Sequence, residues 1–174
     1  MAETQRFDTL MLGGELDWTR GNLTFTWIPA YVYLDSAPDY WLGTIRARLT
    51  AHYNQLSNEL RVAGTRGERV EWVGGVQAYD VRNDGYLALF TNQPFQFRQS
   101  NITGNRLAGY AAFGEWRHRT RDRLRLTAGA RVSTTHREGR GFTSDRLGAL
   151  PYEFDRPFDH LDWKLGVERD VAPE

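Results

Sequence analysis

The chain has 174 residues, enough for one domain of ordinary size, and its 22 basic residues are balanced by 22 acidic ones. This balance gives no reason to expect a nucleic-acid-binding surface, and the absence of cysteine excludes disulfide scaffolds, thiolate zinc sites and cysteine nucleophiles. No run of about 18 consecutive apolar residues occurs, so the sequence contains no transmembrane helix.

The first ten residues have neither the basic start nor the apolar core of a secretory signal. If the protein is exported, we expect either that a leader has been removed or that the chain is an internal segment of a larger protein. The mean hydropathy of −0.60 does not exclude a membrane location. A transmembrane β-barrel needs apolar side chains only at alternate positions of each strand, which keeps the average low.

Apolar and polar residues alternate with a period of two along most of the chain, which predicts β-strands. In chain order, the seven predicted strands are Thr9–Trp18, Leu23–Tyr33, Gln55–Ala63, Arg69–Tyr79, Leu107–Arg117, Arg123–Val132 and a stretch that begins near Leu161. We therefore predict an all-β fold, an antiparallel up-and-down meander of about seven strands.

The polar face of these strands repeatedly carries full charges. They are Glu15, Asp17, Glu59, Arg61, Glu71, Glu115, Arg117, Arg125, Arg131, Asp162, Lys164 and Glu168. Such a face is found on the solvated side of a soluble antiparallel sheet, and it is also found on the inner wall of a membrane barrel with a polar lumen.

The lengths of the connections favour the second interpretation. Three pairs of strands are joined by turns of about four residues, whereas Leu34–Asn54, Asp80–Arg106 and Ser133–His160 form long links. Short periplasmic turns and long extracellular loops are typical of outer-membrane barrels. Aromatic residues near the predicted strand ends fit the aromatic girdles of such barrels: Trp18, Tyr31, Tyr33, Trp72, Tyr79, Tyr110, Trp116 and Trp163. We therefore predict a partial transmembrane β-barrel.

Four sequence blocks carry a family resemblance. They are Leu16–Trp18 with Leu23–Thr26, Gln55–Ala63 with Val70–Val76, Tyr110–Glu115 with Asp122–Arg131, and Trp163–Asp170. In this order they resemble consecutive hairpins in the barrel of TonB-dependent receptors. The resemblance covers nearly the whole chain and identifies residues 1–174 with the N-terminal portion of the barrel domain.

The resemblance implies an outer-membrane receptor that imports a ligand such as a ferric siderophore, within a barrel of about 22 strands that encloses a plug domain. Its implied partners are outer-membrane lipid, the remaining barrel and plug, the TonB complex acting through that plug, and the small-molecule ligand. No nucleic acid, cofactor or enzymatic activity is implied. The sequence shows no plug domain, no energy-coupling segment and no final strand ending in an aromatic residue, so we expect a fragment with unpaired edges on its first and last strands.

The expected loops contain the candidate ligand contacts, because aromatic rings and arginine suit a flat, anionic or aromatic ligand. These candidates are Tyr40, Trp41, Tyr86, Phe95, Phe97, Arg98, Tyr152 and Phe154. The competing interpretation is that loop aromatics only pack against one another or the membrane surface.

Other chemistry has little support. The four histidines have no metal-ligand spacing, which predicts no metal site. Glu15 and Asp17 share a face and could imitate the carboxylate pair of a glycosidase, although charges of this kind recur on every strand. The alternative functions are a soluble all-β module, for example one that binds carbohydrate, and, with least support, an enzyme that uses this pair.

Overall fold

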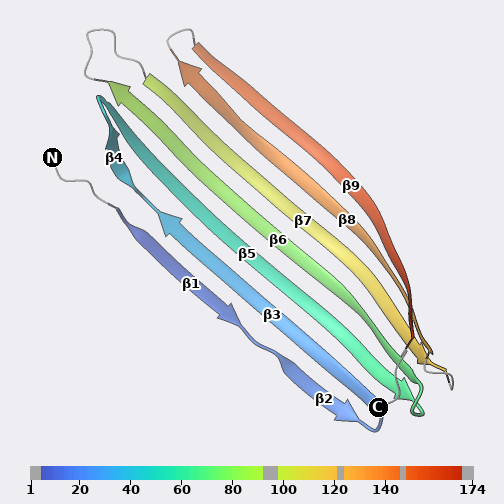
Figure 1. Cartoon of the computed structure of the whole chain (residues 1–174). Coiled ribbons are helices and arrows are strands. Elements are labelled where there is room, and N and C mark those ends of the chain that lie inside the picture. The colour runs from blue at the N-terminus through green and yellow to red at the C-terminus, as the bar shows by residue number, and fades with distance from the viewer. Residues whose placement is uncertain (1–4, 92–97, 121–123, 146–147, 170–174) are drawn as a thin grey trace.

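The computed structural model describes residues 5–91, 98–120, 124–145 and 148–169, with side chains described at 5–90, 103–120, 124–144 and 148–169. The chain forms one curved antiparallel sheet (Figure 1). Its strands are β1 (Phe7–Gly13), β2 (Leu16–Arg20), β3 (Leu23–Ser36), β4 (Asp39–Leu42), β5 (Ile45–Arg66), β6 (Val70–Thr91), β7 (Arg98–Arg119), β8 (Leu124–Asp145) and β9 (Gly148–Arg169).

The strands follow one another across the sheet in chain order. β1 and β2 pair with β3 in one continuous register, and β3 and β4 do the same on β5, so the nine strands occupy seven rows. The predicted fold class, an up-and-down meander of about seven strands, is confirmed. Among the described residues, the β1–β2 row and β9 each pair on one side only, as expected for the two edges.

The strands are longer than the sequence pattern predicts. Each of β5 to β9 has 22 residues, and most of the three segments expected to be irregular loops continues the strands. Alternation reveals a strand only when one face is apolar and the other polar. Asp80–Tyr86, with the sequence DVRNDGY, has polar residues on both faces, so its strand structure leaves no periodic signal. The described chain is then connected by short turns at both ends of the sheet.

We call the end with the turns at Gly21–Asn22 and 67–69 the proximal end, and the opposite end, near Gly43, the distal end (Figure 1). Gly21, Gly43 and Gly67 have positive φ angles of 64°, 66° and 65°, the left-handed conformation that tight turns require and that glycine adopts without strain.

The sheet is curved, so one of its faces is concave and the other is convex. We call the face that carries Leu60, Val76 and Val132 the outer face, and the opposite face, with Gln77 and Arg131, the inner face. On the inner face, side chains of β6 and β8 meet across β7: Arg131 Nη2 of β8 donates to Gln77 Oε1 of β6 at 2.9 Å. The outer-face apolar side chains are the more exposed, Leu60 at 53% and Val132 at 53%. The inner face is therefore the concave one.

Glycines on the inner face make room for large side chains from the next strand. A Cβ atom on Gly109 would lie 2.6 Å from the ring of Tyr79, and one on Gly75 would lie 2.7 Å from the ring of Phe113. The Tyr79 ring crosses β7 at Gly109, and its hydroxyl and that of Thr135 on β8 are 3.0 Å apart. These contacts join strands that are not neighbours and help to hold the curvature.

The sheet encloses almost no core of its own. Among the described residues, only Ala47, Ala88 and Ala111 are buried apolar residues. In that part of the chain there is also no helix that is long and apolar enough to cross a membrane. The large apolar side chains of the outer face therefore need a partner outside the sheet.

Candidate functional surfaces

A continuous apolar surface occupies the proximal part of the outer face. We call it the apolar band. Its largest side chains are Leu10, Leu12, Leu16, Trp18, Phe25, Trp27, Tyr31, Tyr33, Leu56, Leu60, Trp72, Val76, Tyr110, Trp116, Leu126, Val132, Leu161, Trp163, Leu165 and Val167. No Asp, Glu, Lys or Arg interrupts it among the described residues. Trp163 and Leu165 are 72% and 75% exposed.

Aromatic side chains lie toward both borders of the apolar band. The tryptophans Trp18, Trp72 and Trp116 occupy its proximal part, Trp163 lies about midway between its borders on β9, and Tyr31, Tyr33 and Tyr110 occupy its distal part. Aromatic residues toward both borders of an apolar band are typical of barrels that cross a bilayer. Tyr79, which the sequence places with them, lies on the inner face instead.

Charged residues mark both borders of the band, and both borders cross the strands obliquely. At the distal border, the apolar band ends at Asp8 in the first row, and Asp8 is level with Glu153 of β9. On β9 itself the band already ends at Asp159, which is six residues closer to the proximal end. At the proximal border, Arg20 is level with Leu165, and β9 reaches Arg169 only four residues later.

This drift gives the inclination of the band. Six steps between rows span about 29 Å, and four to six residues span about 13–20 Å along a strand, so the borders are inclined by about 25–35° to the hydrogen-bond direction. Barrel strands tilt by about 35–45° from the membrane normal, which produces an inclination of nearly this size. On β9, the ten residue steps from Asp159 to Arg169 span about 33 Å, or about 25 Å after a 40° tilt, the height of the apolar band of such barrels.

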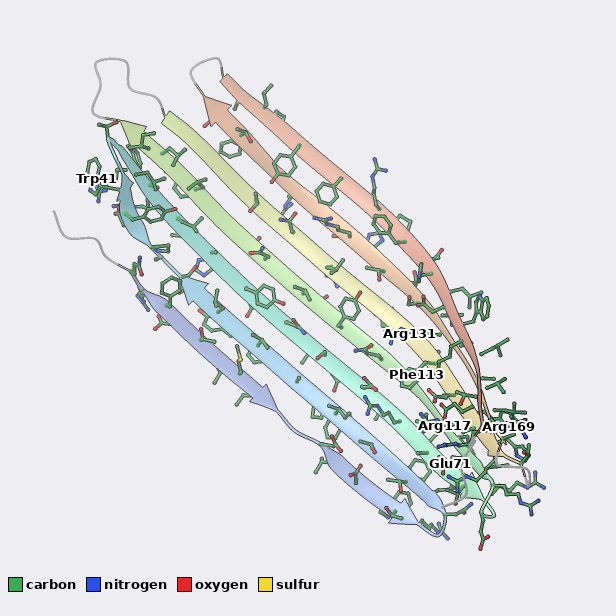
Figure 2. All side chains as sticks on the ribbon, in the orientation of Figure 1. Trp41, Glu71, Phe113, Arg117, Arg131 and Arg169 are labelled. Carbon is green, nitrogen blue, oxygen red and sulfur yellow. The ribbon has the colours of Figure 1, made fainter. Side chains whose placement is uncertain are left out.

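The proximal part of the inner face is charged and internally paired. Lys164 Nζ lies 2.5 Å from Glu115 Oε2, a contact that passes over Gly129 of β8, and Arg117 Nε lies 3.1 Å from Glu115 Oε1. Arg61 pairs with Glu59 in the same way. Figure 2 shows Phe113, Arg131, Arg117 and Glu71 toward this end, on β6, β7 and β8.

The distal part of the outer face carries a belt of ion pairs. Asp80 accepts hydrogen bonds from Arg82 at 3.1 Å and from Arg106 at 2.8 Å. At the tip of the sheet, Asp39 accepts from Arg46 and Arg48 at 2.8 and 3.2 Å. The hydrogen bond from Arg46, followed by that from Arg48, lowers the pKa of Asp39 to about 2 despite partial desolvation. Ion pairs of this kind suit a surface in contact with water.

The distal part of the inner face is different again. It carries aromatic and aliphatic side chains, among them Tyr53, Tyr152, Phe154 and Phe158, together with two arginines, Arg137 and Arg156. The guanidinium carbon of Arg137 lies 5.3 Å from the centre of the Phe154 ring. The sequence interpretation missed these arginines because they fall in Ser133–His160, which it treats as a loop. Extending the alternation of Leu124–Val132 along the chain places Arg137 on the inner face.

The structure separates the predicted ligand contacts. Tyr40, Tyr152 and Phe154 lie on the inner face of β4 and β9, whereas Trp41 and Tyr86 lie on the outer face of β4 and β6. Figure 2 shows Trp41 at the distal end. All five lie in strands and not in loops. Arg98 is the first residue of β7, and Phe95 and Phe97 lie outside the described residues. Their role in ligand contact stays a prediction.

The remaining polar candidates are dispersed. His52, His136 and His160 each face carboxylates, at 3.3 Å from Asp35, 2.8 Å from Asp155 and 3.0 Å from Asp162. No group of three metal-binding side chains occurs in the described part of the chain.

The carboxylates that the sequence offers as a catalytic pair are placed differently. Asp17 accepts a hydrogen bond from the Thr26 hydroxyl at 2.5 Å, and Glu15 lies between β1 and β2. Asp17 is therefore held by its neighbouring strand, on the inner face with the other proximal charges.

Comparisons with known proteins place the fold. No protein-family model and no curated protein matches the sequence. Among solved structures, the chain is similar to the ferric yersiniabactin uptake receptor FyuA from Yersinia pestis, with a TM-score of 0.85 and 18% identity. It is also similar to the ferric citrate transporter FecA in the unliganded form, with a TM-score of 0.55 and 12% identity. Each match covers 98% of this chain, and the chain spans 26% of either protein.

Both neighbours are TonB-dependent receptors, and what they share with this chain is the fold of a barrel sector. The likeness to such barrels that the sequence motifs predict is thereby confirmed at the level of the fold. FyuA is an uptake receptor and FecA is a transporter, and neither is an enzyme.

Proposed function

We propose that residues 1–174 are a sector of the barrel wall of a bacterial outer-membrane TonB-dependent receptor, and that the whole receptor imports a ligand such as a ferric siderophore. The observation that carries the proposal is the apolar band, which has no charged residue, aromatic side chains near both borders and an inclination close to the strand tilt of a barrel. The fold shared with FyuA and FecA supports it. A soluble binding module gives no reason for an exposed band with parallel oblique borders.

In the whole receptor, the apolar band contacts lipid, the inner face lines the lumen beside the plug, and the distal strands rise above the membrane. The TonB complex acts through the plug, which belongs to the remainder of the receptor. The inner distal surface with Tyr152 and Phe154 is where this sector faces an incoming ligand. Tyr40, on the same face, is a further candidate.

Tryptophan fluorescence tests the membrane placement. Two variants of the full chain retain one tryptophan each, Trp163 in the apolar band or Trp41 near the distal tip, with the other tryptophans replaced by phenylalanine. Each is reconstituted in vesicles whose acyl chains carry bromine, which quenches tryptophan on contact. We expect strong quenching of Trp163 and little of Trp41. Equal quenching of both, or none of either, contradicts the proposal.

A further inference from the structure

Arg137 of β8 and Arg156 of β9 stand directly opposite each other in the register of the sheet. Both belong to the inner face, in its distal part. Like charges at directly opposed positions of an antiparallel pair destabilise it. The pair therefore needs an explanation other than the stability of the sheet.

Other opposed arginines in the described chain have a carboxylate beside them. Arg82 and Arg106 are opposed on the outer face, and Asp80 accepts hydrogen bonds from both. Near the proximal turns, Arg125 is opposed to Arg119 and pairs with Glu168 at 3.5 Å.

Arg137 and Arg156 have no such partner among the described residues. The acids next to them in sequence, Glu138 and Asp155, point to the outer face, where both contact His136. Distal to Glu59 and Asp162, no carboxylate lies on the inner face among the residues whose side chains are described, which end at Ser144 on β8, and Arg137 and Arg156 are the only arginines or lysines there. The place that Asp80 occupies between the outer arginines has no counterpart here.

Phenylalanine rings lie beside the arginine pair on β9. The Phe154 ring lies against Gly139, where a Cβ atom would overlap with it, and Arg137 sits above the same ring. Phe158, the next inner residue of β9 on the proximal side of Arg156, is 54% exposed. Guanidinium groups bind oxyanions through paired N–H donors, and exposed phenyl rings offer stacking faces.

We propose that Arg137 and Arg156 form an anion clamp that binds a ligand with oxyanions on aromatic rings, the ligand supplying the carboxylate or phenolate that the described side chains lack here. This inference rests on the proposed function, since it places the clamp on the lumen side of a receptor wall. It names the substrate class as an anionic aromatic chelate.

Binding to the full chain in detergent micelles tests the clamp. The probe is the trianionic ferric complex of a synthetic hexadentate tris-catecholate chelator, measured by equilibrium dialysis, with a neutral ferric tris-hydroxamate as the comparison ligand. We expect saturable binding of the anionic complex only, weakening as salt is added. R137M/R156M should weaken it about a hundredfold, since losing a hydrogen bond to a charged group costs about tenfold each. The matched control R82M/R106M, on the outer face, should leave it unchanged.

A charge reversal separates binding from folding. R156E places a carboxylate opposite Arg137, so we expect it to raise the urea concentration at the unfolding midpoint while abolishing binding. A purely structural role for Arg156 predicts the opposite, a lower midpoint. Equal binding of both chelates, binding that survives R137M/R156M, or no binding at all overturns the proposal.

The two experiments distinguish failure of the clamp from failure of the proposed function. Quenching of Trp163 by brominated lipid together with no chelate binding rejects the clamp and leaves the membrane placement standing. Chelate binding in micelles without quenching in vesicles rejects the receptor wall and leaves an anion-binding sheet.

Discussion

The proximal and distal halves of the sheet are built from the same strands in the same register, yet their polarity is reversed. In the proximal half, the outer face is apolar, and the inner face carries pairs such as Glu115 with Lys164. In the distal half, the outer face carries pairs such as Asp80 with Arg106, and the inner face is largely aromatic and aliphatic. Because the backbone is continuous, the surroundings must change along each strand. The proposed receptor wall accounts for the reversal, because it would have lipid outside the proximal half and water outside the distal half.

The largest change in the free energy of unfolding is expected from a charge placed in the middle of the apolar band. V76R places an arginine in the part of the apolar band that we propose to contact lipid. We expect this substitution to lower the free energy of unfolding from vesicles by about 2–4 kcal/mol. T50R, on the distal outer face, is the matched control and should change it by less than about 0.5 kcal/mol. Urea titrations of vesicle-bound protein measure both. Similar costs at the two positions would remove the distinction between the halves.

A smaller effect is expected where inner-face rings cross glycine. G109A forces the Tyr79 ring off β7 and breaks its contact with Thr135, at a cost of about 1–2 kcal/mol. G114A is the control on the same strand, since its new Cβ atom would find its nearest neighbour at 3.8 Å. In a Y79A background, the cost of G109A should vanish. If it persists there, the ring does not explain the glycine.

The ion pair between Lys164 and Glu115, on the proximal inner face, should contribute less to the free energy of unfolding. Lys164 and Glu115 are 57% and 21% exposed, so K164M should cost at most about 1 kcal/mol, because solvent screens such pairs. The difference should shrink as sodium chloride is raised from low to molar concentration. A loss of several kcal/mol that is insensitive to salt would show that this surface is shielded from water.

The smallest effect concerns pH at the distal tip. Arg46 and Arg48 lower the pKa of Asp39 to about 2, so the ionised carboxylate stabilises the β4–β5 hairpin above pH about 3.8, and this stabilisation fades as the pH falls toward 2. The protection of β4 amides from hydrogen exchange, measured relative to their intrinsic rate at each pH, should therefore fall over that interval. D39N should exchange rapidly at every pH and abolish the acid transition, and an unchanged acid transition in D39N would assign it to another group.

The sequence predicts one half of this molecule much better than the other. Around Leu124–Val132, one face is apolar and the other polar, and the alternation reveals both the strand and its apolar outer side. Beyond Thr134 the outer face becomes charged and the inner face mixes Arg137 with Gly139 and Gly141, so the same strand has no periodic signature. The clamp pair was missed for this reason, since opposition of Arg137 and Arg156 depends on pairing between strands, which composition does not encode.

Cysteine accessibility along β8 tests the polarity reversal most directly, because the natural chain has no cysteine. Single-cysteine variants at each position from Leu126 to Thr143, reconstituted in vesicles, are treated with a membrane-impermeant maleimide. We expect protection at alternate positions 126, 128, 130 and 132, and its loss from His136 onward, with Glu138 and Arg140 fully reactive. Protection that continues at these alternate positions through Arg140, or uniform reactivity along the whole strand, would contradict it.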